Sequence, residues 1–174
     1  RPVSPAASAV SVAQDRAREK AHFVACGVPC APYAVIETAE QLAAVSPDLL
    51  PGILKTARMG YDGKGQVRVK TPAELAAAWD SVGQVPCVLE KMLPLQLECS
   101  VIVARGADGA MVHLPVQRNL HRDGILAVTE VYDGNLPPAL AAQAVAAAKS
   151  VAEGLQYVGV LCVEFFVLQD GSLV

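Results

Sequence analysis

The feature that most limits how this chain can fold is a glycine-rich run between two segments with strand character. Residues 52–56 and 66–70 are rich in Ile, Leu and Val, and the run Gly60-Tyr-Asp-Gly-Lys-Gly-Gln66 joins them, so we expect a hairpin. Three glycines within six residues let backbone N–H groups approach a ligand, and Lys64 adds a positive charge. The spacing matches neither the dinucleotide G-x-G-x-x-G nor Walker A. The run predicts a hairpin that closes over phosphates, or, as the alternative, an ordinary turn.

Charge along the chain indicates the same region. The 174 residues carry 14 Lys+Arg and 17 Asp+Glu, which gives a net charge of −3. The positive charge is densest between residues 55 and 70, and a basic glycine-rich segment in an acidic chain is a candidate site for a small anion. The net charge argues against a general nucleic-acid binder, and no apolar run reaches the roughly 18 residues of a membrane span.

Helix and strand signals alternate in an order that predicts an α+β fold. We expect helices over residues 11–26, 38–45, 71–81 and 140–154, and strands over 33–36, 52–56, 66–70, 87–90, 97–104, 111–116, 125–131 and 157–168. Thr38 and Thr71 start the spacing of capping boxes. Residues 91–96 are expected to connect two α+β lobes with a cleft near them, and residues 117–124 to form a polar loop.

Four charged residues and one loop are candidates for chemistry. Lys55 ends an apolar strand and can present its ammonium to a phosphate. Glu90 precedes the connector, where a carboxylate can accept from an amine or a ribose hydroxyl, and Glu98 follows eight residues later. Glu164 lies in an apolar run, so it is paired, bound to metal, or on the outward face of an edge strand. Residues 119–124 place an imidazole, a guanidinium and a carboxylate together.

Five cysteines have unrelated spacings and do not form a recognisable zinc pattern. We expect reduced, buried thiols in a cytoplasmic protein.

Together, these motifs resemble the ATP-grasp enzymes, and among them the 5-(carboxyamino)imidazole ribonucleotide synthetases of purine biosynthesis. The resemblance covers essentially the whole chain, and its segments are Gln14-Asp-Arg16 with Glu19-Lys20, Ile53-Leu-Lys-Thr56, Gly60 to Gln66, Val101 to Gly106, Asn119-Leu-His-Arg-Asp-Gly-Ile-Leu126, and Tyr157 to Glu164. The Gly60 to Gln66 and Asn119 to Leu126 segments are the specific ones within the family.

The resemblance implies an ATP-grasp fold of two α+β lobes and a set of site residues. Lys55, at the ATP phosphates, and His121, lining the nucleotide site, would be catalytic. Glu98 would bind the ribose hydroxyls, and Glu164 would be a magnesium ligand. Further ATP contacts would come from the closing lid and from the adenine-facing backbone of the connector: Gly60, Tyr61, Asp62, Gly63, Lys64, Gly65, Gln66, Glu90, Lys91, Met92 and Leu93. Tyr61 and Asp62 would also face the substrate.

The implied reaction is the ATP-dependent carboxylation of 5-aminoimidazole ribonucleotide by bicarbonate through carboxyphosphate. The products would be 5-(carboxyamino)imidazole ribonucleotide, ADP and phosphate. The implied cofactors are ATP and Mg²⁺, with Mn²⁺ as a substitute, and the partners are these small molecules, with no nucleic acid or membrane. A cytoplasmic ligase, homodimeric at full length, is expected. Charge that develops on transferring phosphoryl oxygens calls for Lys and Mg²⁺ rather than a covalent residue.

The two ends of the chain depart from the family pattern. The first residue is not Met, the family's N-terminal domain is absent, and the chain stops at Val174 before the Asn-Glu pair that supplies the second metal ligand. We expect residues 1–20 to be a leading segment and helix start, 21–90 the small lobe with its lid, and 91–174 a truncated large lobe. The chain alone is expected to lack synthetase activity.

Two alternatives remain open. One is another ATP-grasp ligase, such as the formate-dependent glycinamide ribonucleotide transformylase or biotin carboxylase. The other is a noncatalytic nucleotide-binding module, against which the joint presence of Lys55, Glu98, His121 and Glu164 argues.

Overall fold

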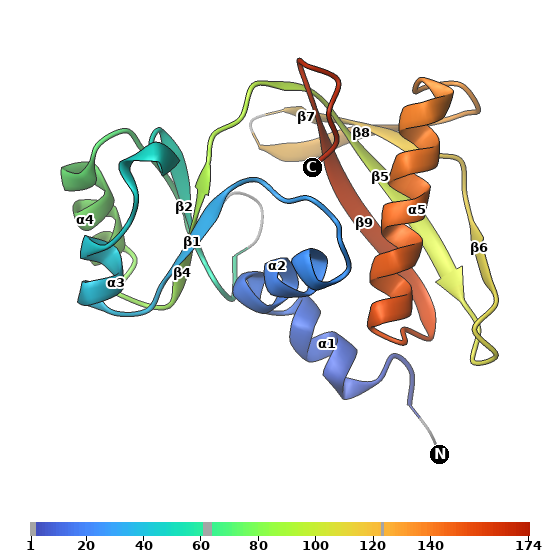
Figure 1. The fold of residues 1–174 in the computed structure, drawn as a ribbon, viewed down its shortest axis with the longest axis horizontal. Helices are drawn as coiled ribbons and strands as arrows, with labels where there is room; N and C mark the ends of the chain where they lie inside the picture. Colours follow the sequence, from blue (N-terminus) through green and yellow to red (C-terminus); the bar gives the residue numbers. More distant parts are fainter. Residues whose placement is uncertain (1–2, 61–63, 123) are drawn as a thin grey trace. The chain divides into compact units, whose positions relative to one another are not determined.

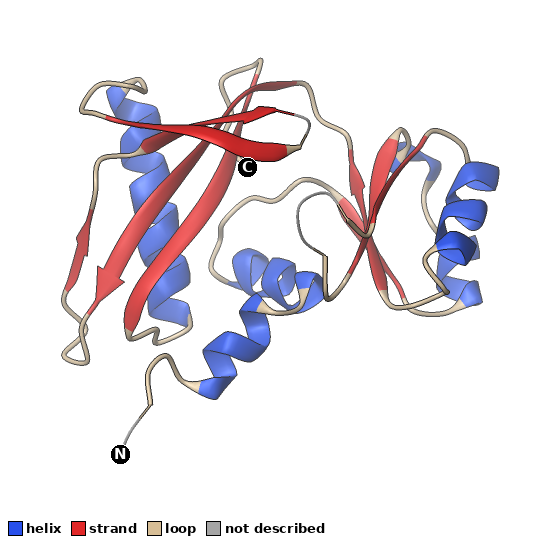
Figure 2. Cartoon of the chain, turned by 180° about the vertical axis from the view of Figure 1, so that it is seen from behind, coloured by secondary structure: helices blue, strands red, loops and turns tan. Residues whose placement is uncertain are grey.

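The computed structural model describes residues 3–60, 64–122 and 124–174 of the chain, which forms two compact units (Figures 1 and 2). Unit 1 comprises Arg1–Val12, Ala21–Cys30 and Pro94–Val174, and unit 2 comprises Ala13–Lys20 and Ala31–Leu93. Each unit contains one sheet, and the pairings between named strands are antiparallel. This architecture confirms the predicted α+β class.

Unit 2 is a four-stranded sheet with helices on one face. Its strands are β1 (Tyr33–Ile36), β2 (Gly52–Thr56), β3 (Gln66–Val69) and β4 (Cys87–Lys91), in the order β1-β4-β2-β3. Helices α3 (Ala39–Ala43) and α4 (Pro72–Ser81) lie on the same side of the sheet in Figure 1, and a 3-10 turn, η1 (Pro47–Leu49), precedes β2. The core of the unit includes Ile36, Leu54, Val69, Trp79 and Leu89. Since strand side chains alternate, the other sheet face is left for polar groups.

The predicted helix starts in unit 2 are largely confirmed. Thr38 accepts from the Gln41 N–H while the Gln41 side chain accepts from the Thr38 N–H, which completes a capping box. Thr71 likewise accepts from the Glu74 N–H at 3.2 Å. The Glu74 carboxylate, however, accepts from the Lys70 N–H, one residue earlier than a capping box requires.

Unit 1 is a five-stranded sheet covered by one long helix. Its strands are β5 (Leu95–Arg105), β6 (Met111–His113), β7 (Gln117–Arg122), β8 (Ile125–Val131) and β9 (Gly159–Leu168). Strand β9 pairs with β5 along its length, while β6 and β7 pair with successive parts of β5. Helix α5 (Pro138–Gly154) packs on the apolar face, and the core there includes Val101, Val103, Ala148, Val163 and Phe165. The expected turn between β5 and β6 is present, with Gly109 at φ +85°.

The single helix predicted over residues 11–26 is wrong, because the structure has two helices there. They are α1 (Ala7–Ala13) and α2 (Arg16–Ala25). Asp15 lies between them, and its Oδ1 accepts from the N–H groups of Ala17 and Arg18 at 3.1 and 3.2 Å. An Asp side chain that binds these amides caps a new helix start, and this interrupts the periodic pattern.

The polar loop predicted over residues 117–124 is also wrong, because residues Gln117–Arg122 form β7. Gln117 and Asn119 are buried amides on the same sheet face as Glu98 and Ser100, so no apolar alternation marks this strand in the sequence. The connector is shorter than the predicted 91–96, since β4 runs to Lys91 and β5 starts at Leu95.

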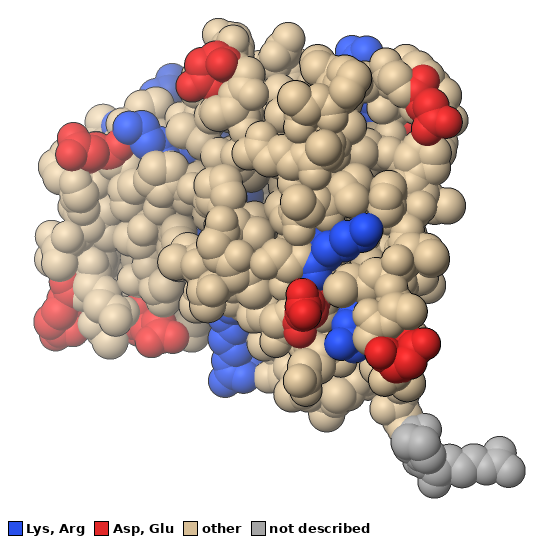
Figure 3. All heavy atoms as spheres, turned by 45° about the vertical axis from the view of Figure 1, so that its right-hand side comes forward, with Lys and Arg blue, Asp and Glu red and all other residues tan. Residues whose placement is uncertain are grey.

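No described helix is long and apolar enough to cross a lipid bilayer. Figure 3 shows one face of the molecule, on which charged side chains lie singly or in small groups among uncharged ones. Charge on this face does not single out a site, and the candidate residues lie instead at partly buried positions on the two sheets.

Candidate functional site

The sheet face of unit 2 opposite its apolar core carries the predicted phosphate residue. Leu54 and Leu89 point to the helical core, so their neighbours Lys55 and Glu90 point to the opposite face. Ile53 is directly opposite Glu90 in the register of β2 and β4. Lys55, two residues from Ile53, is therefore a diagonal neighbour of Glu90 on one face.

Lys55 and Glu90 form an ion pair with Lys20. The Lys55 Nζ lies 2.7 Å from Glu90 Oε2, and the Lys20 Nζ lies 3.2 Å from Glu90 Oε1. All three side chains are 11–14% exposed. The sequence predicted a Glu90 close to a nucleotide amine or hydroxyl, whereas within unit 2 its carboxylate is bound by two ammonium groups.

The two lysines control the charge of Glu90. Burial by itself would raise the pKa of Glu90, but the positive charges of Lys55 and then Lys20, with their hydrogen bonds, outweigh it and lower the pKa below its ordinary value. Glu90 is therefore ionised at neutral pH, and the trio has a net charge of +1.

Replacing Glu90 with glutamine is expected to flatten the acid dependence of stability. Because the folded pKa is depressed, the stabilisation from Glu90 is present above its ordinary pKa and is lost as the pH falls through the folded value. Urea unfolding between about pH 6 and pH 3 should show a steeper loss for the wild type than for Glu90→Gln. Glu37→Gln, an exposed carboxylate in the same unit, should keep the wild-type slope. Equal slopes for wild type and Glu90→Gln would contradict the assignment.

The glycine-rich run is partly described. Gly60 and residues 64–66 are placed, whereas Tyr61, Asp62 and Gly63 lie outside the described residues. Gly65 has φ +71°, and a Cβ on it would lie 2.5 Å from Thr56 Oγ1, so this position requires glycine. Its carbonyl accepts from the Thr56 N–H at 2.9 Å. The run thus returns directly beside the residue that follows Lys55.

Arg16 is a basic residue at this location to which the sequence analysis gave no role. Its Nη2 lies 3.5 Å from where a Cβ on Gly60 would be, and its N–H donates to the Ala57 carbonyl at 2.9 Å. The start of α2 is therefore tied to the segment that leads into the glycine-rich run. Arg58 nearby is paired with Asp15 at 2.9 Å. The signal that could have identified Arg16 is its place in the Gln14 to Lys20 segment.

The predicted adenine-facing connector starts at the end of β4. The N–H groups of Lys91 and Met92 donate to the carbonyls of Pro32 and Pro51 at 2.9 and 3.0 Å. Within the described chain these two amides are therefore used by the protein itself. Leu93 follows in the extended segment before β5.

In unit 1 the sheet face opposite the apolar core carries the other predicted residues. Glu98 lies on β5 and His121 on β7, and Glu98 Oε2 is 3.0 Å from His121 Nδ1. Nδ1 is buried and has no partner of hydrogen-bond geometry among the described residues. The structure therefore brings these two predicted site residues together.

A buried polar network next to this pair was missed by sequence reasoning. Asn119 Nδ2 donates to Ser100 Oγ at 3.0 Å, and Thr129 Oγ1 donates to Asn119 Oδ1 at 3.2 Å. Ser100, Gln117 and Asn119 are each at most 5% exposed. The network joins β5, β7 and β8, so it fixes the register of the strands that carry Glu98 and His121.

Glu164 lies on β9, where it is directly opposite Ser100 and exposed. This is the outward position on a sheet edge that the sequence left as the alternative to burial. Among the described residues no group of three His, Cys, Asp or Glu is placed to hold a metal ion. One carboxylate cannot hold a metal ion on its own, whereas Mg²⁺ is usually bound by one or two carboxylates together with substrate phosphates.

A comparison with protein families decides the fold family. The ATP-grasp domain model matches residues 21–174. The chain belongs to the ATP-grasp family.

Relatives of known name narrow the similarity within the ATP-grasp family. The chain is 40% identical to the N5-carboxyaminoimidazole ribonucleotide synthase of Brucella melitensis, with 98% of the chain and 48% of that protein aligned. It is 37% identical to the enzyme of the same name from Pseudomonas aeruginosa, with 98% and 47% aligned. The chain spans about half the length of these relatives.

Solved structures of ATP-grasp enzymes also match the fold of the chain. An N5-carboxyaminoimidazole ribonucleotide synthetase in complex with ADP is 36% identical, with TM-score 0.84, over 94% of this chain and 44% of that one. The Thermus thermophilus synthetase is 36% identical, with TM-score 0.86, over 99% of this chain and 46% of that one. Biotin carboxylase from Campylobacter jejuni has TM-score 0.88 over 98% and 41%, but at 21% identity this likeness shows the fold alone.

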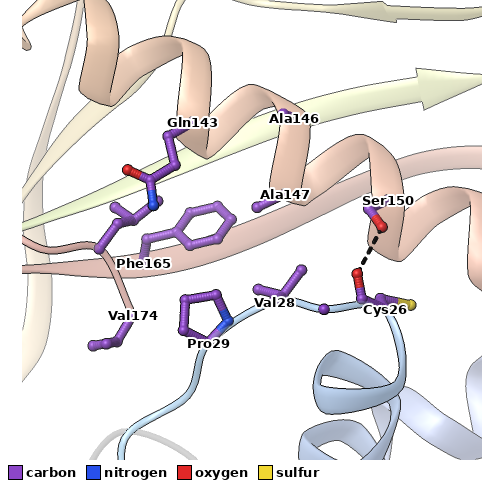
Figure 4. Close-up of a pocket in the computed structure, with 11 residues that line it drawn as sticks. Cys26, Val28, Pro29, Gln143, Ala146, Ala147, Ser150, Phe165 and Val174 are labelled. Carbon is purple, nitrogen blue, oxygen red and sulfur yellow. Dashed lines mark hydrogen bonds between the residues drawn. The ribbon is translucent and has the colours of Figure 1, made fainter.

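Two cavities in unit 1 of this ATP-grasp chain lie away from the predicted residues. One, of about 270 Å³, is bounded by α5, Phe165 and the segment after α2, where Ser150 Oγ donates to the Cys26 carbonyl (Figure 4). The other, of about 490 Å³, lies between α5 and the residues before it. The first has no charged lining residue, and none of the predicted site residues lines either. Neither cavity is therefore the candidate nucleotide site.

The cysteines differ in burial more than the sequence predicted. All five are free thiols, and Cys87 and Cys99 are buried, with burial raising the pKa of each to about 11. Cys162, by contrast, is exposed on β9, so the prediction of buried thiols is wrong for it.

We expect Cys162 to be the first cysteine to react with a thiol reagent such as DTNB in the folded protein. The thiolate is the reactive form, and burial and the charge of Glu164 raise the pKa of Cys162 as well, so its advantage over the buried Cys87 and Cys99 is mainly its exposure. The rapid phase should disappear in Cys162→Ser and remain in Cys99→Ser. A rapid phase that survives Cys162→Ser would assign it to another thiol.

Proposed function

We propose that this chain forms the nucleotide-binding part of an enzyme that carboxylates 5-aminoimidazole ribonucleotide with bicarbonate at the expense of ATP. The single observation that carries the proposal is the 40% identity, over 98% of the chain, to a relative named for this product. The positions of Lys55, Glu98 and His121 add physical support, because each lies with other charged or polar groups on the sheet face opposite the apolar core of its unit.

In unit 2, the Lys55 ammonium binds phosphate oxygens as negative charge develops on them, and the Gly60 to Gln66 run covers the phosphates. Arg16 is placed to add a second cation at the same phosphates. The connector contacts adenine through backbone groups other than the Lys91 and Met92 N–H groups, which bond to Pro32 and Pro51.

In unit 1, the Glu98 carboxylate accepts from the ribose hydroxyls. His121 lines the same site, with its Nδ1 3.0 Å from Glu98 Oε2. Glu164 is the residue of this chain proposed to hold Mg²⁺ (or Mn²⁺). That ion, when bound, neutralises charge on the phosphate oxygens. No side chain of the chain is needed as a covalent nucleophile, since phosphoryl transfer is promoted by positioning and charge. Tyr61 and Asp62 remain predicted contacts for the ribonucleotide substrate.

We also propose a cytoplasmic location and a homodimer for the full-length protein, as the resemblance implies. Both follow from the proposed reaction and its family rather than from a contact in this chain.

The experiment that tests the function measures ADP release from ATP on two proteins. One is the 174-residue chain, and the other is a chimera in which the chain replaces the matching segment of the Brucella melitensis relative. ADP release by the chimera should require both bicarbonate and 5-aminoimidazole ribonucleotide. Release that instead requires formate with glycinamide ribonucleotide, or biotin, would support the other ATP-grasp ligases. A chimera that binds MgATP and turns over with none of these would support the noncatalytic module.

A further inference from the structure

Glu90 is a buried carboxylate whose two oxygens are held by different lysines. Oε2 is 2.7 Å from Lys55 and Oε1 is 3.2 Å from Lys20. The residue is 8% exposed, and burying an ionised carboxylate is costly unless it is paired on good geometry. The arrangement fixes the positions of both ammonium groups with respect to one rigid strand, β4.

Lys20 also contacts an aromatic ring. Its Nζ lies 5.2 Å from the centroid of the Tyr33 ring, and Tyr33 is directly opposite Glu90 in the register of β1 and β4. Lys20 is thus held between an aromatic face and a carboxylate, both within unit 2. Lys20 therefore has a structural role at this position.

Lys55 is held by Glu90 on one side and adjoins the glycine-rich run on the other. An ammonium has three donors, and Glu90 takes one of them at 2.7 Å. The next residue, Thr56, is bonded to Gly65. Among the described residues Lys55 therefore keeps donors for a second anion at the base of the run.

We infer that Glu90 is a positioning residue that aims Lys55 at the nucleotide phosphates, and that Lys20 acts through Glu90 by preventing it from neutralising Lys55. This inference rests on the proposed nucleotide binding by Lys55. Without Lys20, one carboxylate would face one ammonium, and the pair would carry no net charge to attract a phosphate. With Lys20, the trio stays cationic while the Lys55 side chain is still fixed.

If Glu90 did not position Lys55, its removal would be expected to change anion affinity in the opposite direction. If Glu90 only opposed the positive charge of the site, its removal would leave two lysines and would tighten the binding of an anion. If it positions Lys55, its removal frees a flexible four-carbon side chain, and phosphate binding weakens.

The test is calorimetric titration of the 174-residue chain with MgATP and, separately, with adenosine. We expect Glu90→Gln to weaken MgATP binding about tenfold, the size of one charge-assisted hydrogen bond, and to leave adenosine binding within about twofold. Lys20→Met should weaken MgATP binding about threefold alone and add nothing in the Glu90→Gln background, because it acts through Glu90. Glu37→Gln is the matched control in the same unit and should bind as the wild type does.

Three results would overturn the inference. These are unchanged or tighter MgATP binding by Glu90→Gln, an equal loss for adenosine, which indicates a merely structural role, or additive effects of Lys20→Met and Glu90→Gln. Should Glu90→Gln fail to fold by circular dichroism, Lys20→Met decides, and wild-type MgATP affinity in that variant would overturn the inference. Failure of the proposed function is distinguishable, since the wild type would then not bind MgATP or Lys55→Ala would bind it normally.

Discussion

Replacing Lys55 with alanine is expected to weaken MgATP binding by about 100-fold, the largest effect of any single change in unit 2. An ammonium that binds a phosphate oxygen contributes about 1.5–3 kcal/mol, and each 1.4 kcal/mol is about tenfold in affinity. The contribution of Lys55 is expected toward the upper end of that range, because its side chain is only 14% exposed and is held by Glu90 at 2.7 Å. The loss should be measured by calorimetry on the folded chain.

The control for this change is Lys70→Ala. Lys70 is an exposed lysine directly after β3, in the same basic segment of the sequence, so it removes an equal charge without touching the Lys55 and Glu90 pair. Long-range attraction alone would make the two variants similar and would make both losses shrink as salt is added. Direct contact predicts that only Lys55→Ala loses binding strongly and that adenosine, which has no phosphate, binds Lys55→Ala normally. Similar losses in both variants would remove Lys55 from the site.

The strand and the loop around Lys55 were predictable because their signals are local. Alternation of Leu54 and Lys55 defines the two faces of β2, and three glycines define the following run. The capping spacing of Thr38 and Gln41 also acts over three residues and was confirmed as a box. Signals of this kind depend on neighbours in sequence, so they survive without knowledge of the tertiary fold.

The surroundings of Glu90 were not predictable in the same way. Its partners come from α2 and β2, 70 and 35 positions earlier in sequence, and only the antiparallel order β1-β4-β2-β3 brings them together. The loop predicted where β7 lies was wrong for a related reason. The buried residues of β7, Gln117 and Asn119, are amides, and they are bonded to Ser100, Thr129 and the Pro115 carbonyl, so no apolar alternation marks the strand.

Replacing Glu98 with alanine is expected to weaken MgATP binding by about 30-fold and to remove the preference of the site for a ribose sugar. A carboxylate that accepts from ribose hydroxyls contributes about 2 kcal/mol through charge-assisted hydrogen bonds. The wild type should therefore bind ATP more tightly than 2′-deoxy-ATP or 3′-deoxy-ATP, and Glu98→Ala should bind all three alike. Calorimetry with the three nucleotides measures the ratio directly.

The ratio matters more than the absolute loss, because Glu98 also lies 3.0 Å from His121. If Glu98 served only to hold His121, its removal would weaken ATP and both deoxynucleotides by the same factor, and the wild type would show no ribose preference to lose. Glu153→Gln, an exposed carboxylate on α5 in the same unit, should leave all three affinities at wild-type values. A ribose preference that persists in Glu98→Ala would assign the hydroxyl contact to another residue, whereas its loss, with adenine and phosphate contacts intact, places the Glu98 carboxylate at the sugar.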